Sequence, residues 1–185
     1  MRRSISAFRL ICLLGSLFFQ PALADERALL KAAKANDTRS VLALLDAGAD
    51  PNGRGAQGET PLMAAALHGN IKVAKALLQA RADCGLSDKL DRTALWIAAA
   101  GSQTELVALL AKQDCAQATI NLADEQSRST ALHMAISTFV KASGLRALVR
   151  GGASLTAKNW LGQTPPATCK QTAKRLSRCR SAGIL

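Results

Sequence analysis

Cysteine and histidine are the residues of this 185-residue chain that could transfer electrons, bind a metal or attack a substrate. No two cysteines have C-x-x-C spacing, so neither a redox motif nor a zinc knuckle is predicted. Neither His68 nor His133 is followed three or four residues later by Cys, His, Asp or Glu, so we expect no metal site. The cysteines are Cys12, Cys84, Cys115, Cys169 and Cys179.

Patterns for other catalytic chemistry are missing from the sequence. A nucleophile needs a base and an orienting group, and the chain has no G-x-S-x-G. Residues 53–58 (GRGAQG) resemble a phosphate-binding loop only superficially, because no strand precedes them and they fall in a turn. We therefore expect a protein that is not an enzyme, has no cofactor and uses both histidines structurally.

The first 24 residues have the pattern of a secretory signal peptide. Arg2, Arg3 and Arg9 form a basic region, and residues 10–19 form an apolar run too short to span a bilayer as a helix. Residues 22–24 (ALA) are a small-residue cleavage site, so cleavage is expected after Ala24. The alternative is an uncleaved anchor. The compact signal favours the bacterial periplasm.

Export changes what the cysteines mean. The mature chain keeps four, and an even number in an oxidising compartment predicts two disulfides, for which three pairings are open. Cys12 lies inside the apolar run without the surroundings of a lipid-attachment site.

Charge is distributed unevenly along the mature chain. Residues 25–125 carry 11 Lys and Arg against 13 Asp and Glu, whereas residues 126–185 carry 10 Lys and Arg and no acidic residue. The basic C-terminal end favours contact with an acidic protein surface or anionic lipid. Nucleic acid is disfavoured, because the chain is exported and its basic residues are not interleaved with aromatic ones.

Two short phrases recur in fixed order. The first is TPLMAAA at residues 60–66, and it returns as TALWIAA at 93–99, TALHMAI at 130–136 and TPPATCK at 164–170, at intervals of 33, 37 and 34 residues. The second is LLDAGAD at residues 44–50, with later copies at 77–83 and 148–154. Fixed recurrence at this period is the signature of a repeat architecture.

Each unit resembles an ankyrin repeat, whose marker is T-P-L-H-x-A followed by G-A-D. The resemblance implies an all-α solenoid of about five stacked helix-turn-helix units with β-turn or hairpin tips. We place the domain at residues 25–185. It comprises an N-terminal cap at 25–52, internal units at 53–86, 87–122 and 123–157, and a degraded, basic C-terminal cap at 158–185.

Local chemistry agrees with these units. A threonine N-cap accepts a backbone N–H, and a following proline loses only a donor that has no helical partner. Gly69-Asn70 is expected to end an inner helix in a left-handed conformation. Residues 112–119 replace the usual glycine turn and make the third unit about five residues longer, an insertion that we expect to be a loop and to make the third-to-fourth junction the least regular.

The repeat geometry suggests how the cysteines pair. Cys169 and Cys179 fall on the expected inner and outer helices of the last unit, so we predict a bridge between them. Cys84 and Cys115 are expected to end successive outer helices. Either the insertion lets Cys115 reach back to Cys84, or both remain free, part-buried thiols.

The family generally binds partners on its concave face, formed by the tips and the exposed side of the inner helices. Among the corresponding residues, an apolar stripe is expected, in which Trp160 either is an interaction hot spot or packs against its neighbours. Trp96, in the family's histidine position, is expected in the core. The partner-binding residues implied by the resemblance are Arg54, Gln57, Ala64, Leu67, Lys89, Leu90, Ile97, Met134, Lys158, Trp160 and Leu161.

The resemblance to exported bacterial ankyrin-repeat proteins implies a non-catalytic protein–protein interaction module of the periplasm. We expect a monomer without a membrane segment in its mature chain. Its partner would be an envelope or stress-defence enzyme, or a toxin that it neutralises as an immunity protein. The alternative is a secreted effector that binds host proteins.

Overall fold

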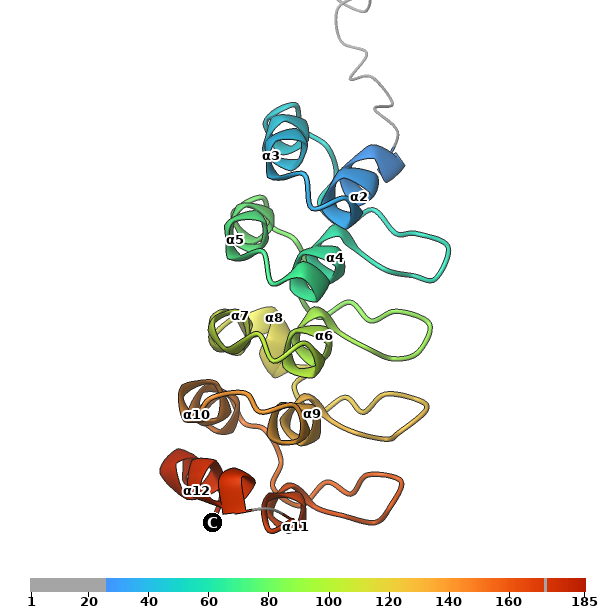
Figure 1. Cartoon of the computed structure of the whole chain (residues 1–185). Helices are drawn as coiled ribbons and strands as arrows, with labels where there is room; N and C mark the ends of the chain where they lie inside the picture. Colours follow the sequence, from blue (N-terminus) through green and yellow to red (C-terminus); the bar gives the residue numbers. More distant parts are fainter. Residues whose placement is uncertain (1–25, 172) are drawn as a thin grey trace, which may run out of the picture.

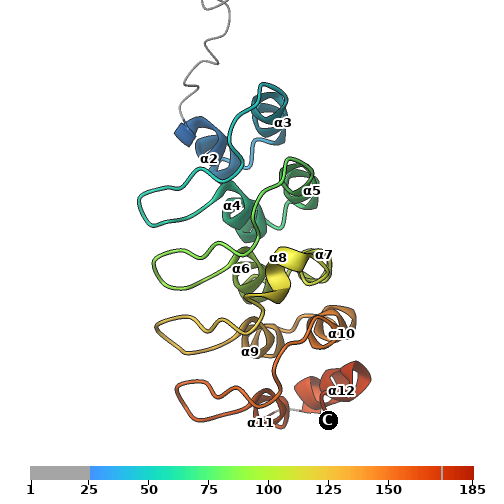
Figure 2. The same ribbon diagram turned by 180° about the vertical axis from the view of Figure 1, so that it is seen from behind.

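The computed structural model describes residues 26–171 and 173–185, so the predicted signal peptide at residues 1–24 lies outside the described residues. Within these ranges the helices form two columns, and long turns project to one side of the inner column (Figure 1). The view from behind shows the same arrangement (Figure 2). The inner helices are α2 (Glu26–Lys34), α4 (Pro61–His68), α6 (Ala94–Ala100), α9 (Ala131–Ser137) and α11 (Pro165–Cys169). The outer helices are α3 (Thr38–Asp46), α5 (Ile71–Gln79), α7 (Thr104–Leu110), α10 (Ala142–Arg150) and α12 (Ala173–Ala182). An additional short helix, α8, spans Asp114–Gln117.

No strand is assigned in the described ranges, although two isolated antiparallel bridges close the bases of two turns, at Ser87–Thr93 and Ala123–Thr130. The all-α repeat solenoid expected from the sequence is confirmed.

The inner helices begin and end as the recurring phrase predicts. Thr60 and Thr93 are extended residues whose hydroxyls accept backbone N–H groups from Met63 at 3.3 Å and Trp96 at 3.2 Å. Gly69 ends α4 with a φ of 66°, in the left-handed region that glycine enters without strain. The two helices capped in this way, α4 and α6, have eight and seven residues, so the chain reverses into an outer helix after about two turns.

The core runs through the whole stack and depends on small inner residues. Ala65, Ala66, Ala98, Ala99 and Ala135 are buried where α4, α6 and α9 pack on one another. The outer helices add leucines on their inward faces, all buried: Leu77, Leu106, Leu110, Leu145 and Leu148. Alanine allows neighbouring inner helices to approach closely, while leucine fills the wider space between the two columns.

The insertion after the third outer helix differs from the loop that we expected. Its residues form α8, and Cys115 lies in this helix rather than at the end of α7. Cys84 lies in the turn after α5, and the two cysteines are joined by a disulfide with a Cα–Cα distance of 5.4 Å. The extra helix therefore supplies the reach that brings Cys115 back to the preceding unit.

A second disulfide joins Cys169 of α11 to Cys179 of α12, with a Cα–Cα distance of 6.1 Å. Both cysteines are buried, as is expected for a bridge between the inner and outer helices of one unit. The cross-link holds α11 and α12, the last helical pair of the described residues, together.

Part of the basic C-terminal tail is used to close the fold. Arg178 donates from its guanidinium to the carbonyls of Val140 (2.8 Å) and Ile136 (3.5 Å), and Arg175 donates to that of Ser137 (3.3 Å). Both guanidinium groups also lie over the Phe139 ring, at 4.7 Å for Arg178 and 5.6 Å for Arg175. Two of these carbonyls, from Ile136 and Ser137, are at the C-terminal end of α9, where the helix leaves them without partners, and that of Val140 lies in the turn that follows.

His133 has a structural role, as predicted. It is buried, and its Nδ1 accepts from the Thr130 backbone N–H at 3.4 Å, so Nε2 carries the proton and donates to the Gln163 carbonyl at 3.0 Å. Burial, partly offset by that carbonyl, lowers the pKa of His133 below its ordinary value of 6.5. The neutral imidazole therefore links α9 by a hydrogen bond to the projecting turn that precedes α11.

We predict that His133 makes the protein less stable in mild acid. With its folded-state pKa lowered, the unfolded chain binds a proton first, so stability decreases as pH falls through about 6.5 and rises again toward neutrality. Urea unfolding at about pH 7.5 and about pH 5 should show this loss in the wild type and a smaller one in His133→Gln. His68→Gln is the matched control and should keep the wild-type pH dependence.

We also predict unequal contributions from the two disulfides. The Cys84–Cys115 bridge spans 31 residues and the Cys169–Cys179 bridge spans 10. In the chain-entropy model the longer loop contributes about 3–4 kcal/mol and the shorter about 2–3 kcal/mol. Thermal unfolding of the Cys84→Ser/Cys115→Ser and Cys169→Ser/Cys179→Ser double variants should show the larger decrease in the first. The reverse order would contradict the assignment of Cys115 to a long-range clamp.

Candidate protein-binding groove

The projecting turns, which we call the tips, are joined in a ladder of backbone hydrogen bonds. Each tip is closed by a backbone N–H from its first residue to a carbonyl at its end: Gly55 to Glu59, Asp88 to Arg92, Asp124 to Ser129 and Asn159 to Gln163. Successive tips are then linked by one bond each, from Lys89 N–H to the Gln57 carbonyl (2.9 Å), from Glu125 to Leu90 (3.0 Å) and from Trp160 to Ser127 (3.0 Å). The ladder gives the tips a fixed register over the inner helices.

Asp88 holds the second tip from inside. Its carboxylate accepts backbone N–H groups from Leu90 (2.9 Å) and Arg92 (3.0 Å) and a charged pair from the Arg92 guanidinium (2.6 and 2.9 Å). Burial opposes ionisation of this carboxyl, but the hydrogen bonds from Arg92 and Leu90 outweigh it and lower the pKa of Asp88. Asn159 makes the same two backbone contacts in the last tip, to Leu161 and Gln163.

The first tip is also held by a carboxylate, but this one comes from the last residue of the tip rather than from the first. Glu59 accepts the Gln57 N–H at 2.8 Å and pairs with Lys34 of the preceding unit. The hydrogen bond from Lys34, which outweighs burial, lowers the pKa of Glu59. Gly55 occupies the place of Asp88, and a Cβ there would lie 2.3 Å from the Glu59 carboxylate. A side chain at position 55 and an inward carboxylate at position 59 therefore exclude each other.

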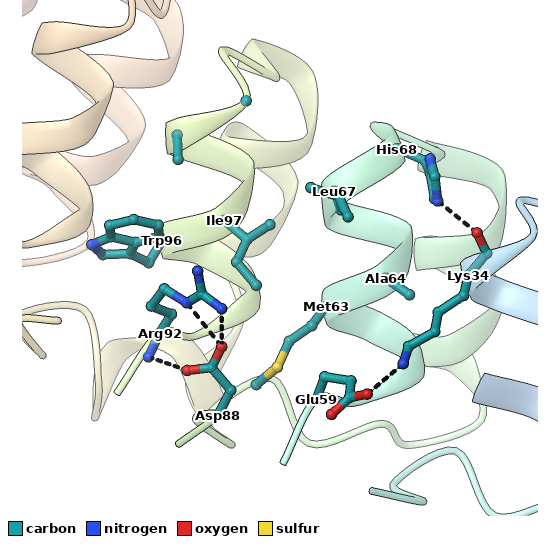
Figure 3. A pocket seen from close by; sticks show the side chains of 12 residues that line it. Lys34, Glu59, Met63, Ala64, Leu67, His68, Asp88, Arg92, Trp96 and Ile97 are labelled. Carbon is teal, nitrogen blue, oxygen red and sulfur yellow. Dashed lines mark hydrogen bonds and ion pairs between the residues drawn. The ribbon is translucent and has the colours of Figure 1, made fainter. Parts of the chain in front are cut away.

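A groove of about 600 Å³ lies between α4 and α6 above these two tips. Met63, Ala64, Ile97 and Ala100 supply most of its apolar lining. In Figure 3, Leu67 of α4 and Ile97 of α6 lie on facing sides, and Trp96 stands above Arg92. The charged groups at the rim, Asp88 with Arg92 and Glu59 with Lys34, are paired with each other. His68 completes the rim, with Nε2 2.9 Å from the Lys34 carbonyl.

The structure places three of the predicted partner-binding residues, Ala64, Leu67 and Ile97, in this groove. Leu67 is 66% exposed, whereas Ala64 is only 6% exposed and adds little surface. Met134, Trp160 and Leu161 line a second groove of about 420 Å³ between α9 and the last tip. Leu90 is half-buried and lines neither of these two grooves, so the expected apolar stripe is interrupted there. The remaining predicted residues are exposed on tips: Arg54, Gln57, Lys89 and Lys158.

Trp96 is the main residue that the sequence placed wrongly. We expected it in the core, but it is half-buried and lines both grooves. Its Nε1 donates to the Ser129 carbonyl at 2.8 Å, and Arg92 lies 5.9 Å from its ring centroid. The residue type at this position could have predicted its exposure. Trp96 stands where the next unit has the buried imidazole of His133, and an indole is too large for a site of that size.

Within residues 26–171 and 173–185, no group of three or more His, Cys, Asp or Glu side chains could hold a metal ion. None of the helices in these ranges is both long and apolar enough to cross a bilayer.

Comparison with known proteins agrees with this architecture. The family model for ankyrin repeats, in three copies, matches residues 9–88 and 80–159. The chain belongs to the ankyrin-repeat family. As in other ankyrin-repeat proteins, which are generally non-catalytic, its architecture indicates a protein–protein interaction module.

Several curated relatives contain a similar stretch. A mitochondrial disaggregase of Bos taurus is 34% identical over 140 residues, which cover 76% of this chain and 20% of that protein. The inactive serine/threonine-protein kinase TEX14 of Bos taurus is 40% identical over 92 residues, covering 49% and 6%. A mitochondrial disaggregase of Homo sapiens is 46% identical over 63 residues, covering 34% and 9%. The chain thus spans a fifth or less of the relatives that it matches.

We predict that Asp88 stabilises the second tip chiefly through its two backbone contacts. Asp88→Ala should lower the free energy of unfolding by about 2–3 kcal/mol, because two part-buried N–H groups and the Arg92 guanidinium lose their acceptor. Asp88→Asn should cost about 1 kcal/mol, since asparagine makes the same contacts at position 159. Urea unfolding measures both, and Asp91→Asn, on the same tip, is the control expected to leave stability unchanged. Equal losses for the alanine and asparagine variants would show that the Arg92 ion pair dominates instead.

Proposed function

We propose that this ankyrin-repeat chain is a non-catalytic binding module of the bacterial periplasm that holds one protein partner on its concave face. The groove between α4 and α6 is the proposed principal contact. Envelope or stress-defence enzymes, and toxins neutralised by an immunity protein, are the partner classes that we propose.

The single observation that carries the proposal is an apolar groove whose charged rim is already paired. Asp88 and Glu59 each have a cationic partner within the chain, so the groove offers little free charge to a ligand. Leu67 stands exposed at its mouth, and Trp96 forms a wall. Aromatic side chains beside small apolar pockets are typical of interaction hot spots. The surface therefore suits an apolar side chain of a partner protein.

Two disulfides support the proposed location. Bridges such as Cys84–Cys115 and Cys169–Cys179 form and persist in oxidising compartments, including the bacterial periplasm. The predicted signal peptide points to the same compartment. The likeness to the disaggregases covers only the repeat-containing stretch and supports the scaffold, so we carry no disaggregase activity over.

The test is capture of a partner from periplasmic extract, followed by affinity measurement with the purified pair. Leu67→Asp should weaken the affinity roughly tenfold or more, because it puts an unpaired charge at the mouth of an apolar groove. Ile97→Ala should weaken it by a smaller factor. Leu67 is exposed, so its replacement should leave the helical circular dichroism unchanged.

The matched control is Leu185→Asp, which changes another exposed leucine away from the groove. It should leave affinity at the wild-type value. If Leu67→Asp binds the partner as tightly as the wild type does, the groove is not the contact surface.

A further inference from the structure

The tip ladder ends with an unused acceptor. In the first and second tips, the carbonyl two residues after the opening residue receives a bond from the next tip: Gln57 from Lys89, and Leu90 from Glu125. The corresponding residue of the last tip is Leu161. Its carbonyl accepts no hydrogen bond from the described residues, which contain no later tip. The ladder therefore presents one open position in the same register.

The open position is flanked by large apolar side chains. Trp160 is 66% exposed and Leu161 is 56% exposed. The corresponding pairs are Ala56-Gln57 in the first tip and Lys89-Leu90 in the second, so two large apolar residues coincide at the open end. Exposed edges in soluble proteins are usually protected by charged residues, and an apolar edge marks a contact surface.

A ready-made cavity adjoins this edge. The second groove, of about 420 Å³, is lined by Trp160 and Leu161 from the tip, by Met134 from α9 and by Trp96 from α6. Arg175 of α12 reaches its far side. A segment paired with the open edge could therefore place an apolar side chain between the two indoles while keeping its backbone on the ladder.

The charged side chains around the edge favour a ligand segment of one sign of charge. Lys158 on the last tip and Arg128 on the preceding one are exposed, and residues 126–185 contain no Asp or Glu. The carboxylates of the preceding tip are Asp124, which is buried and bonded to Ser127 and Ser129, and Glu125, which is exposed. Cations therefore outnumber available carboxylates at this edge, and an acidic ligand is favoured.

We propose that the open end of the tip ladder binds an extended, acidic segment of the partner protein. A backbone N–H of the segment donates to the Leu161 carbonyl, one apolar side chain enters the second groove, and flanking carboxylates face Lys158 and Arg128. This inference rests on the proposed function and names the chemistry of the partner. A second copy of the chain fits poorly, because its first tip would bring Arg54, Arg27 and Lys31 toward an edge that is already basic.

The experiment uses labelled short peptides and fluorescence anisotropy with the disulfide-bonded mature protein. The first peptide has a Val-Leu-Val centre between runs of aspartate, the second replaces aspartate by lysine, and the third carries N-methyl groups on the central residues. We expect saturable binding of the first peptide, weakened by salt, and at least roughly tenfold weaker binding of the other two. Equal binding of the aspartate and lysine peptides overturns the charge assignment, and undiminished binding of the methylated peptide overturns the ladder contact.

Protein variants locate the site. Trp160→Ala and Leu161→Ser should each weaken binding of the aspartate peptide roughly tenfold, with unchanged circular dichroism because both side chains are exposed. Leu67→Asp, which changes an equally exposed apolar residue in the first groove, should bind this peptide as the wild type does. Wild-type affinity in both tip variants overturns the proposal.

Vesicles of phosphatidylglycerol test the competing class of ligand. If they bind the wild type but not Trp160→Ala, while the aspartate peptide does not bind, the edge is a lipid contact and the proposal is overturned. The two proposals fail separately. If Leu67→Asp loses partner capture but the wild type does not bind the aspartate peptide, only this inference is wrong. If the wild type binds the peptide and Leu67→Asp still captures the partner fully, the assignment of the first groove is wrong.

Discussion

A single pair of short helices cannot bury its apolar side by itself, and the rest of this structure depends on that constraint. Each pair covers its inward face with the next pair, through alanines between the inner helices and leucines between the columns. Because the main helix contacts of the stack join the same or adjacent units, its apolar side chains are buried between neighbours. Its concave side, with the inner helices and the tips, is instead a continuous exposed wall.

Polar contacts within the chain hold the backbone of the tips in place. Three different side chains do this in the same way. In each of three tips, a side-chain oxygen accepts backbone N–H groups that point to the inside of the turn, and the residues are Asp88, Asn159 and Glu59. This internal pairing also explains why the first groove is apolar although charged residues surround it. The carboxylates that close the turns are those that Arg92 and Lys34 neutralise at the rim.

The repeat fold could be predicted because it is written in local signals. Capping threonines, a left-handed Gly69 and alternating small and large apolar residues each specify a piece of one unit, and the units repeat. The exceptions depend on contacts between units. Helix α8 and its Cys115 bridge occupy the insertion that we expected to be a loop, because a disulfide partner 31 residues away stabilises it. The prediction for Trp96 was wrong because the adjacent unit determines how much space is available at its position. The hydrogen bond from Arg178 to the Val140 carbonyl depends on where α9 ends.

In the last described unit the helices and the tip are covered differently, and this difference has a consequence for binding. At the C-terminal end, α12 packs on α10 and α11, and its arginines bind carbonyls at the end of α9 and in the turn that follows it. These contacts close the helical columns, but they lie away from the tips, which project on the opposite side of the inner column (Figure 1). Within the described residues, the cap therefore protects the helices but does not cover the last rung of the tip ladder. A repeat protein that needed only solubility would place polar residues at that rung, as the second tip does with Lys89. The presence of Trp160 and Leu161 there is consistent with a surface whose covering is supplied by another molecule.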